Sequence, residues 1–432
     1  MNPYERMYQD KLVTVEEALS RIRDNDVIAT SQCANEPTAL FQQLHTLRGK
    51  RHGLRMYAPM CMTAPPFLVD PAYKDTFDID VTFLMPGTRK GHAAGAFSYV
   101  PGDLHNGPAR WLDANGCTVF LCAATPMDRH GYFQIPLCLI HERTFLEAAD
   151  RIIVQVNPNL PRVYGDTEFH IRDVDCIVEA ESPLPYLPAT TPSPEEETIG
   201  GYVASLVNDG DTVQLGIGGI PDAAAHALMG KHDLGIHSEM LTNSMVDLVE
   251  AGVVTGRKKT LHPGKLIGTF AYGEQRLYDM MEENPAVRIL RGDYVNDPMV
   301  VARNDNFVSV NSCLGVDLTG QVCSESIGSR QYSGSGGQVD MALGANHSRG
   351  GCSIIAMKST KKGGAISSIS AQLPLGSVVT LSRNEIDYVV TEYGIAPLKG
   401  RSIRRRIDNL IAVAHPDFRG ELRRQAEQLM LW

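Results

Sequence analysis

Short runs of apolar, largely β-branched residues alternate with stretches of helical periodicity along most of the chain. These runs are DVIAT, CTVFLCA, RIIVQV and DCIVEA in the first part, and TVQLGI, VRILRG, CSIIAM, VVTLS and DYVVTEYG in the second. Short apolar strands separated by helices of about a dozen residues are typical of parallel sheets that are covered on both faces. The pattern therefore predicts an α/β fold in both parts, with mostly parallel, open sheets.

A proline-rich stretch separates the two parts. The segment ESPLPYLPATTPSPEEETIG, at 181–200, holds five prolines followed by three glutamates. Proline fixes φ and lacks a backbone donor, so neither a helix nor a central strand is expected to run through this segment. We predict an N-terminal α/β domain at 1–182, a linker at 183–200 and a C-terminal α/β domain at 201–432.

The two predicted domains begin with similar segments. EEALSRIRDNDVIATSQCANEP and YVASLVNDGDTVQLGIGGIP both read as a helix, an Asp-x-Asp turn, a strand, a loop of small residues and a proline at the next helix. The turns pair Asp24 and Asp26 with Asp209 and Asp211. Chance similarity of two βα units is the alternative. A genuine repeat would make the fold a tandem of two related open-sheet domains, with ligands at the loops that follow the carboxyl ends of the strands.

Composition and charge exclude several classes of partner. The 432 residues carry a net charge of −10, with 43% hydrophobic and 21% charged residues, which is typical of soluble globular proteins. An acidic chain disfavours binding to nucleic acid or to an anionic membrane, because both need clustered Lys and Arg. The basic run at 401–406 has an amphipathic pattern and is interpreted as a solvated helix face rather than a polyanion site.

Cysteine usage and the N-terminus indicate a reducing compartment. The nine cysteines include no CxxC pair and are odd in number, so neither a disulfide framework nor a zinc site is predicted. They are expected to be buried thiols. The N-terminal residues are charged and helical, and no uncharged apolar run reaches the ~18 residues of a membrane span. We expect a cytoplasmic protein without a metal site or membrane contact.

A glycine loop is the first feature with candidate chemistry. In QLGIGGIP, at 214–221, a predicted strand ends in three glycines and a helix is expected to open at Pro221. Glycines let backbone N–H groups approach an anion or a tetrahedral oxyanion. The spacing does not match a dinucleotide-binding fingerprint, because the third glycine and the later acidic residue are missing. A tight turn that requires positive φ is the alternative interpretation.

A glutamate in LGIHSEM, at 234–240, is the second feature. Glu239 lies between a short apolar run and a predicted helix that begins near Thr242, which places it at the carboxyl end of a strand. Catalytic groups gather at that edge in open α/β sheets. A carboxylate that only complements the positive end of the helix is the alternative. His237 is either a positioning residue or a packed strand histidine.

The third feature combines a second glycine-rich loop, SGSGGQVD at 333–340, with the lysine loop KSTKKGG at 358–364. A lysine pair after a strand, followed by two glycines, suits the phosphates of a ligand, whereas an exposed turn is the alternative. The glycine-rich loop does not match the serine-hydrolase elbow G-x-S-x-G, because residue 333 is Ser.

Together these motifs resemble the acetyl-CoA hydrolase/transferase family, a branch of the class I CoA transferases that includes butyryl-CoA:acetate and 4-hydroxybutyrate CoA-transferases. The resemblance covers nearly the whole chain. Its carriers are the KLVTVEEA start, NPNLPRVYGDTEFHI, QLGIGGIPDA, GIHSEM, DLTGQVCSESIG, SGSGGQVDM, the lysine loop, SRNEIDYVVTEYGIAPLKG and IAVAHPDFR. Ser335, Lys361 and Met341 depart from residues that are common in the family, which bears on the acyl or CoA pocket.

The resemblance implies a function and a set of site residues. Glu239 would be the catalytic glutamate of a CoA transferase, which moves CoA from a short-chain acyl-CoA to a carboxylate such as acetate through a glutamyl-CoA thioester. It also implies a homo-oligomer, such as a homodimer, that acts in butyrate metabolism and fermentation with no permanently bound cofactor. The positions that contact CoA in the family correspond to Gln214, Leu215, Gly216, Ile217, Gly218, Leu314, Gly337 and Lys362.

Two other functions compete with this one. An acyl-CoA hydrolase would use the same glutamate with water as the acceptor. A CoA-binding or sugar-phosphate sensor would use the α/β scaffold without catalysis. The acyl chain and the acceptor acid are not predicted, because the walls of such a pocket come from loops whose contacts the sequence does not reveal.

Overall fold

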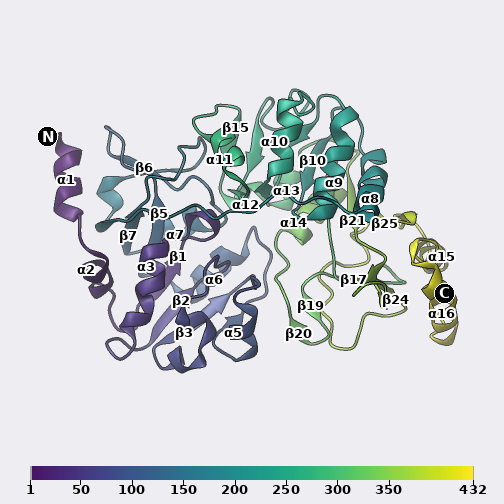
Figure 1. Cartoon of the computed structure of the whole chain (residues 1–432), viewed down its shortest axis with the longest axis horizontal. Coiled ribbons are helices and arrows are strands. Elements are labelled where there is room, and N and C mark those ends of the chain that lie inside the picture. Colours follow the sequence, from purple (N-terminus) through teal and green to yellow (C-terminus); the bar gives the residue numbers. More distant parts are fainter. Residues whose placement is uncertain (1, 432) are drawn as a thin grey trace. The chain divides into compact units, whose positions relative to one another are not determined.

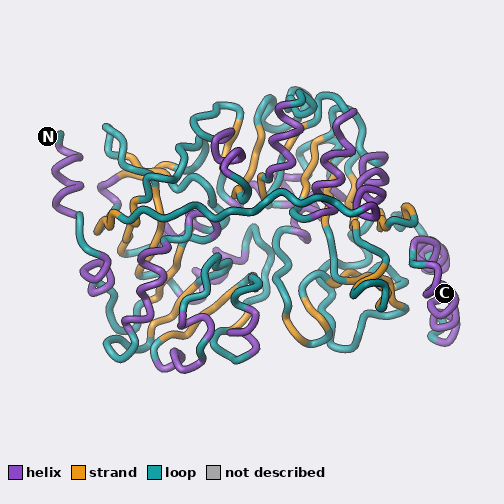
Figure 2. Tube along the Cα trace, in the orientation of Figure 1, coloured by secondary structure: helices purple, strands orange, loops and turns teal. Residues whose placement is uncertain are grey.

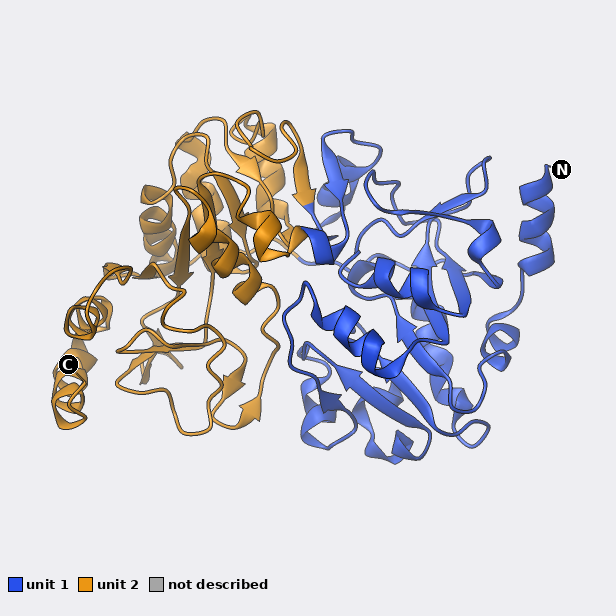
Figure 3. Ribbon diagram, turned by 180° about the vertical axis from the view of Figure 1, so that it is seen from behind, with its two compact units in different colours: residues 1–187, 268–294 blue, residues 188–267, 295–432 orange. Residues whose placement is uncertain are grey.

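A computed structural model of the chain describes residues 2–431 (Figure 1). Its helices and strands form two compact units (Figure 3). The first unit extends to Leu187 and also includes Gly268–Tyr294, whereas the second comprises Pro188–Ile267 and the chain from Val295 onward. No helix within residues 2–431 has both the length and the apolar composition needed to cross a membrane.

The first unit is built on a parallel sheet of seven strands in the order β4-β3-β2-β1-β5-β7-β9. Every neighbouring pair is parallel, with Ile28 of β1 opposite Met56 of β2 and Val119 of β5. Four of the predicted apolar runs form β1, β5, β7 and β9. The bounds are β1 Val27–Thr30, β2 Leu54–Tyr57, β3 Phe77–Val81, β4 Ser98–Tyr99, β5 Val119–Ala124, β7 Arg151–Val156 and β9 Cys176–Glu179.

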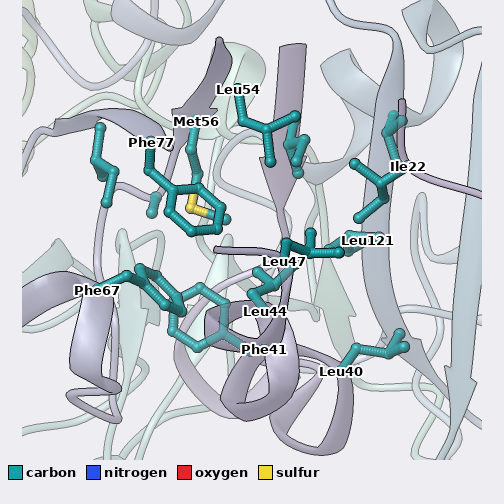
Figure 4. Close-up of a cluster of buried hydrophobic side chains, with 14 of the residues drawn as sticks. Ile22, Leu40, Phe41, Leu44, Leu47, Leu54, Met56, Phe67, Phe77 and Leu121 are labelled. Atoms are coloured by element: carbon teal, nitrogen blue, oxygen red, sulfur yellow. The ribbon is translucent and has the colours of Figure 1, made fainter. Parts of the chain in front are cut away.

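The core of the first unit lies between this sheet and its helices (Figure 4). Phe67 lies between Phe41 and Phe77, with ring centroids 5.2 and 5.3 Å apart. Truncating one such buried aromatic residue to alanine typically costs about 3–5 kcal/mol. The helices of this unit are α1 Pro3–Lys11, α2 Val15–Ser20, α3 Thr38–Gln43, α4 Pro66–Val69, α5 Arg89–Ala93, α6 Gly107–Asn115, α7 Glu142–Ala148 and α11 Gln275–Met281.

The second unit is built on a sheet with the order β11-β10-β16-β21-β25-β26. All pairs are parallel except β25 with β26. Helix α14 packs on β16 and β21, and α8 packs on α9. The bounds are β10 Thr212–Leu215, β11 Gly235–Ile236, β16 Phe307–Asn311, β21 Cys352–Ala356, β25 Tyr388–Thr391, β26 Gly394–Pro397, α8 Pro194–Ser205, α9 Gly219–Ala227, α10 Asn243–Glu250, α13 Pro298–Val301, α14 Gln338–His347, α15 Ile403–Val413 and α16 Pro416–Gln428.

The structure supports the repeat that was predicted from the two Asp-x-Asp turns. Before β1, Asp26 accepts a hydrogen bond from the N–H three residues earlier, and Asp24 accepts one from the N–H of His52. Before β10, Asp211 and Asp209 accept the corresponding bonds, the latter from the N–H of His232. The two units therefore share the turn that leads into a central strand.

The compact units do not coincide with the predicted domain boundaries at 182 and 200. The chain from 180 to 193 is loop (Figure 2), but α8 begins at Pro194, inside the predicted linker, because Ser193 caps it in a capping box with Glu196. The segment 268–294 belongs to the first unit, where the N–H of Leu139 donates to Thr269 and the N–H of Gly292 donates to Leu139.

Two of the predicted apolar runs do not join the large sheets. VVTLS, at 378–382, forms only an isolated bridge between Leu381 and Val322, because it follows a turn at Gly376 and leaves Val378 and Val379 exposed. VRILRG contributes β15 (Val287–Ile289), which lies outside both large sheets.

Candidate active site

The predicted site residues follow neighbouring strands of the second unit at one edge of its sheet. Gly216 comes directly after β10, Glu239 follows β11, and Leu314 follows β16. These three strands are adjacent and parallel, so their carboxyl ends meet at the same edge. Gly337 caps α14, which packs on β16 and β21. The sequence thus brings the glycine loop, the glutamate and the second glycine-rich loop to the edge where open α/β sheets bind ligands.

Glu239 lies in the turn between β11 and β12 (Met240–Leu241). The two residues before it, His237 and Ser238, form hydrogen bonds to neighbouring segments. His237 is fully buried, and its Nε2 lies 2.8 Å from the carbonyl oxygen of Val295. Ser238 donates its N–H to Ile267 at 3.0 Å and its hydroxyl to Leu215 at 3.4 Å. The packed-histidine interpretation of His237 therefore holds, with a hydrogen bond to the peptide that precedes Asn296.

Two donors meet the carboxylate of Glu239. Asn296 donates through Nδ2 to Oε2 at 3.2 Å, and the backbone N–H of Gly337 donates to the same carboxylate. A side chain at position 337 would overlap Oε2 of Glu239 and Nδ2 of Asn296, so only glycine allows this close approach. Gly337 thus lets the N-terminus of α14 lie against the carboxylate, whereas its predicted contact with coenzyme A stays a prediction.

The surroundings of Glu239 favour its protonated form. Burial raises the pKa of Glu239 to about 7, and the nearby carboxylate of Asp340 acts in the same direction. Hydrogen bonds from Asn296 and Gly337 lower that pKa but only in part. Helix α10 begins at Asn243 with Thr242 as its cap, as expected, but the donors that contact the carboxylate come from Asn296 and from α14. The ionised form of Glu239 therefore becomes dominant only above about pH 7.

The glycine loop exposes its backbone rather than its first side chains. Gln214 and Leu215 are buried in β10, and Oε1 of Gln214 accepts hydrogen bonds from Ser309 and Asn311. Ile217 is half exposed, and Gly218 has φ +107°, a conformation that L side chains rarely adopt. Helix α9 begins at Gly219, two residues before the predicted start at Pro221. Contacts from this loop to a ligand would therefore come from the backbone at 216–218.

Leu314 and Lys362 lie in loops beyond the sheet edge. Leu314 donates its N–H to the carbonyl of Cys323. Lys362 is exposed at the tip of the hairpin formed by β22 (Thr360–Lys361) and β23 (Ile366–Ser367). Its φ of +49° and those of Gly363 and Gly364, +66° and +93°, show why this turn needs two glycines. An anion-binding role for Lys362 stays a prediction.

Sequence reasoning missed Asn296 and the role of Asp340. Asn296 lies in the stretch GDYVNDP, which matches no signature, and it reaches Glu239 only through the fold. Asp340 was visible as the last residue of SGSGGQVD, but its electrostatic effect on Glu239 depends on the placement of α14.

Comparisons with known proteins agree with this geometry. Residues 1–188 match the profile of the acetyl-CoA hydrolase/transferase N-terminal domain, and 273–426 match that of the C-terminal domain. The 4-hydroxybutyrate coenzyme A transferase of Clostridium kluyveri is 42% identical over 97% of this chain and 98% of its own length. The succinyl-CoA:cyclohexane-1-carboxylate CoA transferase of Geobacter metallireducens is 41% identical over 99% and 97%. The crystal structure of RipA from Yersinia pestis superposes with a TM-score of 0.93 at 37% identity, covering 99% of this chain and all of RipA.

Proposed function

The chain belongs to the acetyl-CoA hydrolase/transferase family, and on that basis we propose that it is a CoA transferase with Glu239 as its nucleophile. The observation that carries this proposal is the carboxylate of Glu239 at the sheet edge, in contact with the Asn296 amide and the Gly337 N–H. Groups that donate to a carboxylate in the ground state are suitably placed to stabilise the oxyanion that forms when its carbonyl carbon is attacked.

The proposed reaction uses the carboxylate as a covalent carrier. Ionised Glu239 attacks the thioester carbonyl of an acyl-CoA, and CoA thiolate leaves, giving an acyl-glutamyl anhydride. The thiolate then attacks the glutamyl carbonyl, which releases the first acid and forms a glutamyl-CoA thioester. A second acid reverses both steps. Each exchange consumes and regenerates one carboxylate and one thioester, so no ATP is required.

We propose short-chain acids as substrates, with a butyryl-, 4-hydroxybutyryl- or propionyl-CoA type of donor and a carboxylate such as acetate as acceptor. The relative named for 4-hydroxybutyrate supports this class, whereas the relative named for cyclohexane-1-carboxylate points to a larger, cyclic acid. The resemblance to the family also supports a cytoplasmic homodimer in short-chain fatty acid fermentation, with no permanently bound cofactor. Coenzyme A would contact the backbone at 216–218, which follows the buried Gln214 and Leu215, together with Leu314, Gly337 and Lys362. The competing function is an acyl-CoA hydrolase that uses the same Glu239, which the family name includes.

Two experiments test the mechanism. Incubating the enzyme with acyl-CoA and no acceptor should leave CoA attached to the peptide that contains Glu239, as seen by mass spectrometry of a digest. A label at another residue, or no label, would refute the assignment. Initial rates at several acceptor concentrations should give parallel double-reciprocal lines, since the first acid leaves before the second enters. Turnover that does not depend on an acceptor acid would favour the hydrolase.

A further inference from the structure

A buried lysine lies beside the strand that leads to Glu239. Lys259 is 4% exposed, and no carboxylate of the described residues forms an ion pair with it. Its Nζ donates to the carbonyl oxygens of Ile236, at 2.7 Å, and Lys265, at 2.9 Å. Burial lowers the pKa of Lys259 to about 7. The neutral amine still has two N–H groups, which is the number that these two carbonyls need.

The two carbonyls belong to the segments on either side of the turn that carries Glu239. Ile236 ends β11, and Lys265 immediately precedes β13 (Leu266–Gly268). His237 pairs with Ile267 through a single bridge, and Ser238 donates its N–H to Ile267. Lys259 therefore joins these two segments where they have few backbone hydrogen bonds between them.

The first two residues of the motif GIHSEM, Gly235 and Ile236, pack against Lys259 and bind it. A Cβ at position 235 would overlap Cγ and Cδ of Lys259, so glycine leaves the space that the lysine stem occupies. The next residue, Ile236, supplies the carbonyl to Nζ. A fully buried amine without an acidic partner is costly to retain unless the bonds it makes are needed.

We propose that Lys259 is a positioning residue for Glu239: its bonds to Ile236 and Lys265 hold the turn at 237–239 so that the carboxylate reaches Asn296 and Gly337. The proposal rests on the proposed role of Glu239 as the nucleophile. Besides Lys259, the titratable groups that face this turn are His237 within it, His262 beside His237, and Asp340 of α14 beside Glu239.

The test compares Lys259→Met with Lys258→Met, which removes the neighbouring, exposed lysine. Lys259→Met keeps the apolar stem but loses both hydrogen bonds, so the turn relaxes and Glu239 meets its donors less well. The rate of CoA labelling of Glu239 should fall by about ten- to a hundredfold, because small misplacements of a reacting group are costly. The KM for acyl-CoA should stay within about twofold. The pH midpoint of kcat/KM should rise by about half a unit or more, because lost donors no longer favour the carboxylate.

The outcomes separate this proposal from the function on which it rests. If the unaltered enzyme takes no label at Glu239, the proposed function fails. If it takes the label and Lys259→Met matches Lys258→Met in labelling rate and in pH midpoint, the positioning role is refuted. A lower melting temperature and a smaller active fraction with an unmoved midpoint would refute it too, since they indicate a purely structural role. If Lys259→Met does not fold, Lys259→Gln replaces it. The glutamine side chain is one bond shorter than lysine, so its amide reaches at most one of the two carbonyls. We expect a smaller rise in the pH midpoint of kcat/KM than for Lys259→Met. An unmoved pH midpoint would refute the proposal.

Discussion

Replacing Glu239 by glutamine should stabilise the protein at alkaline pH while abolishing covalent catalysis. Burial raises the pKa of Glu239 to about 7, whereas a glutamate in the unfolded chain titrates near 4.5. Between these values the folded state binds more protons than the unfolded state, so the stability of the unaltered protein falls as the pH rises. At pH 8 the ionised carboxylate costs up to about 3 kcal/mol relative to a neutral group of the same shape. Glu239→Gln removes this cost, because its amide does not titrate.

Urea unfolding at pH 5 and at pH 8 measures the effect. The two proteins should have similar midpoints at pH 5, where Glu239 is protonated, and Glu239→Gln should have the higher midpoint at pH 8. Glu427→Gln on the exposed face of α16 serves as the control, since it makes the same chemical change at a solvent-exposed position far along the chain from Glu239. Two results would refute the assigned environment of Glu239. In one, the difference in urea midpoint between the two proteins is the same at pH 5 and pH 8. In the other, the unaltered protein has the higher midpoint at pH 8.

Three further predictions concern catalysis. The kcat/KM for acyl-CoA should rise with pH through a midpoint near 7, because only ionised Glu239 attacks, and a profile that is flat from pH 6 to 8 would contradict this. Gly337→Ala should lower kcat by about a hundredfold or more, because its Cβ displaces the buried carboxylate, and near-normal turnover would contradict the geometry. Lys362→Ala should raise the KM for acyl-CoA by roughly ten- to a hundredfold with kcat nearly unchanged. Lys361→Ala is the matched comparison, and an effect there alone would move the contact by one residue.

The parts of the site that could be predicted are those whose physics is local. A strand that is followed by glycines and a helix predicts a loop with an exposed backbone. The structure places residues 216–218 in such a loop. Glu239 was singled out through the family resemblance of GIHSEM, because a glutamate between an apolar run and a helix is by itself explained by charge complementarity with the helix. Gln214 shows the limit: its membership of the motif did not reveal that its side chain bonds Ser309 within the sheet. That contact depends on strand order, which spacing along the chain does not determine.

The parts that could not be predicted depend on distant segments. Asn296 is 57 residues from Glu239 and meets it because the peptide that precedes it is held by His237. The division into compact units also depends on distant contacts: residues 268–294 lie in the second half of the sequence but pack in the first unit. VVTLS has the composition of a strand, yet it bridges only through Leu381. Composition measures what a segment could pair with, whereas the fold decides whether a partner strand is available.

The shared turn before β1 and β10 is followed by different loops in the two units. After β1, the loop is filled by its own buried side chains: Asn35 donates to Ala123, and the N–H of Gln32 donates to the buried carboxylate of Glu142. These donors of the loop therefore already have hydrogen-bond partners within the first unit. After β10, glycines replace those side chains, and within residues 2–431 no hydrogen bond engages the N–H groups of Ile217 and Gly218. A backbone with free donors at a helix N-terminus is suited to an anion. The second unit thus leaves backbone donors free after β10 that the proposed CoA site would use, whereas the donors of Gln32 and Asn35 after β1 already have partners.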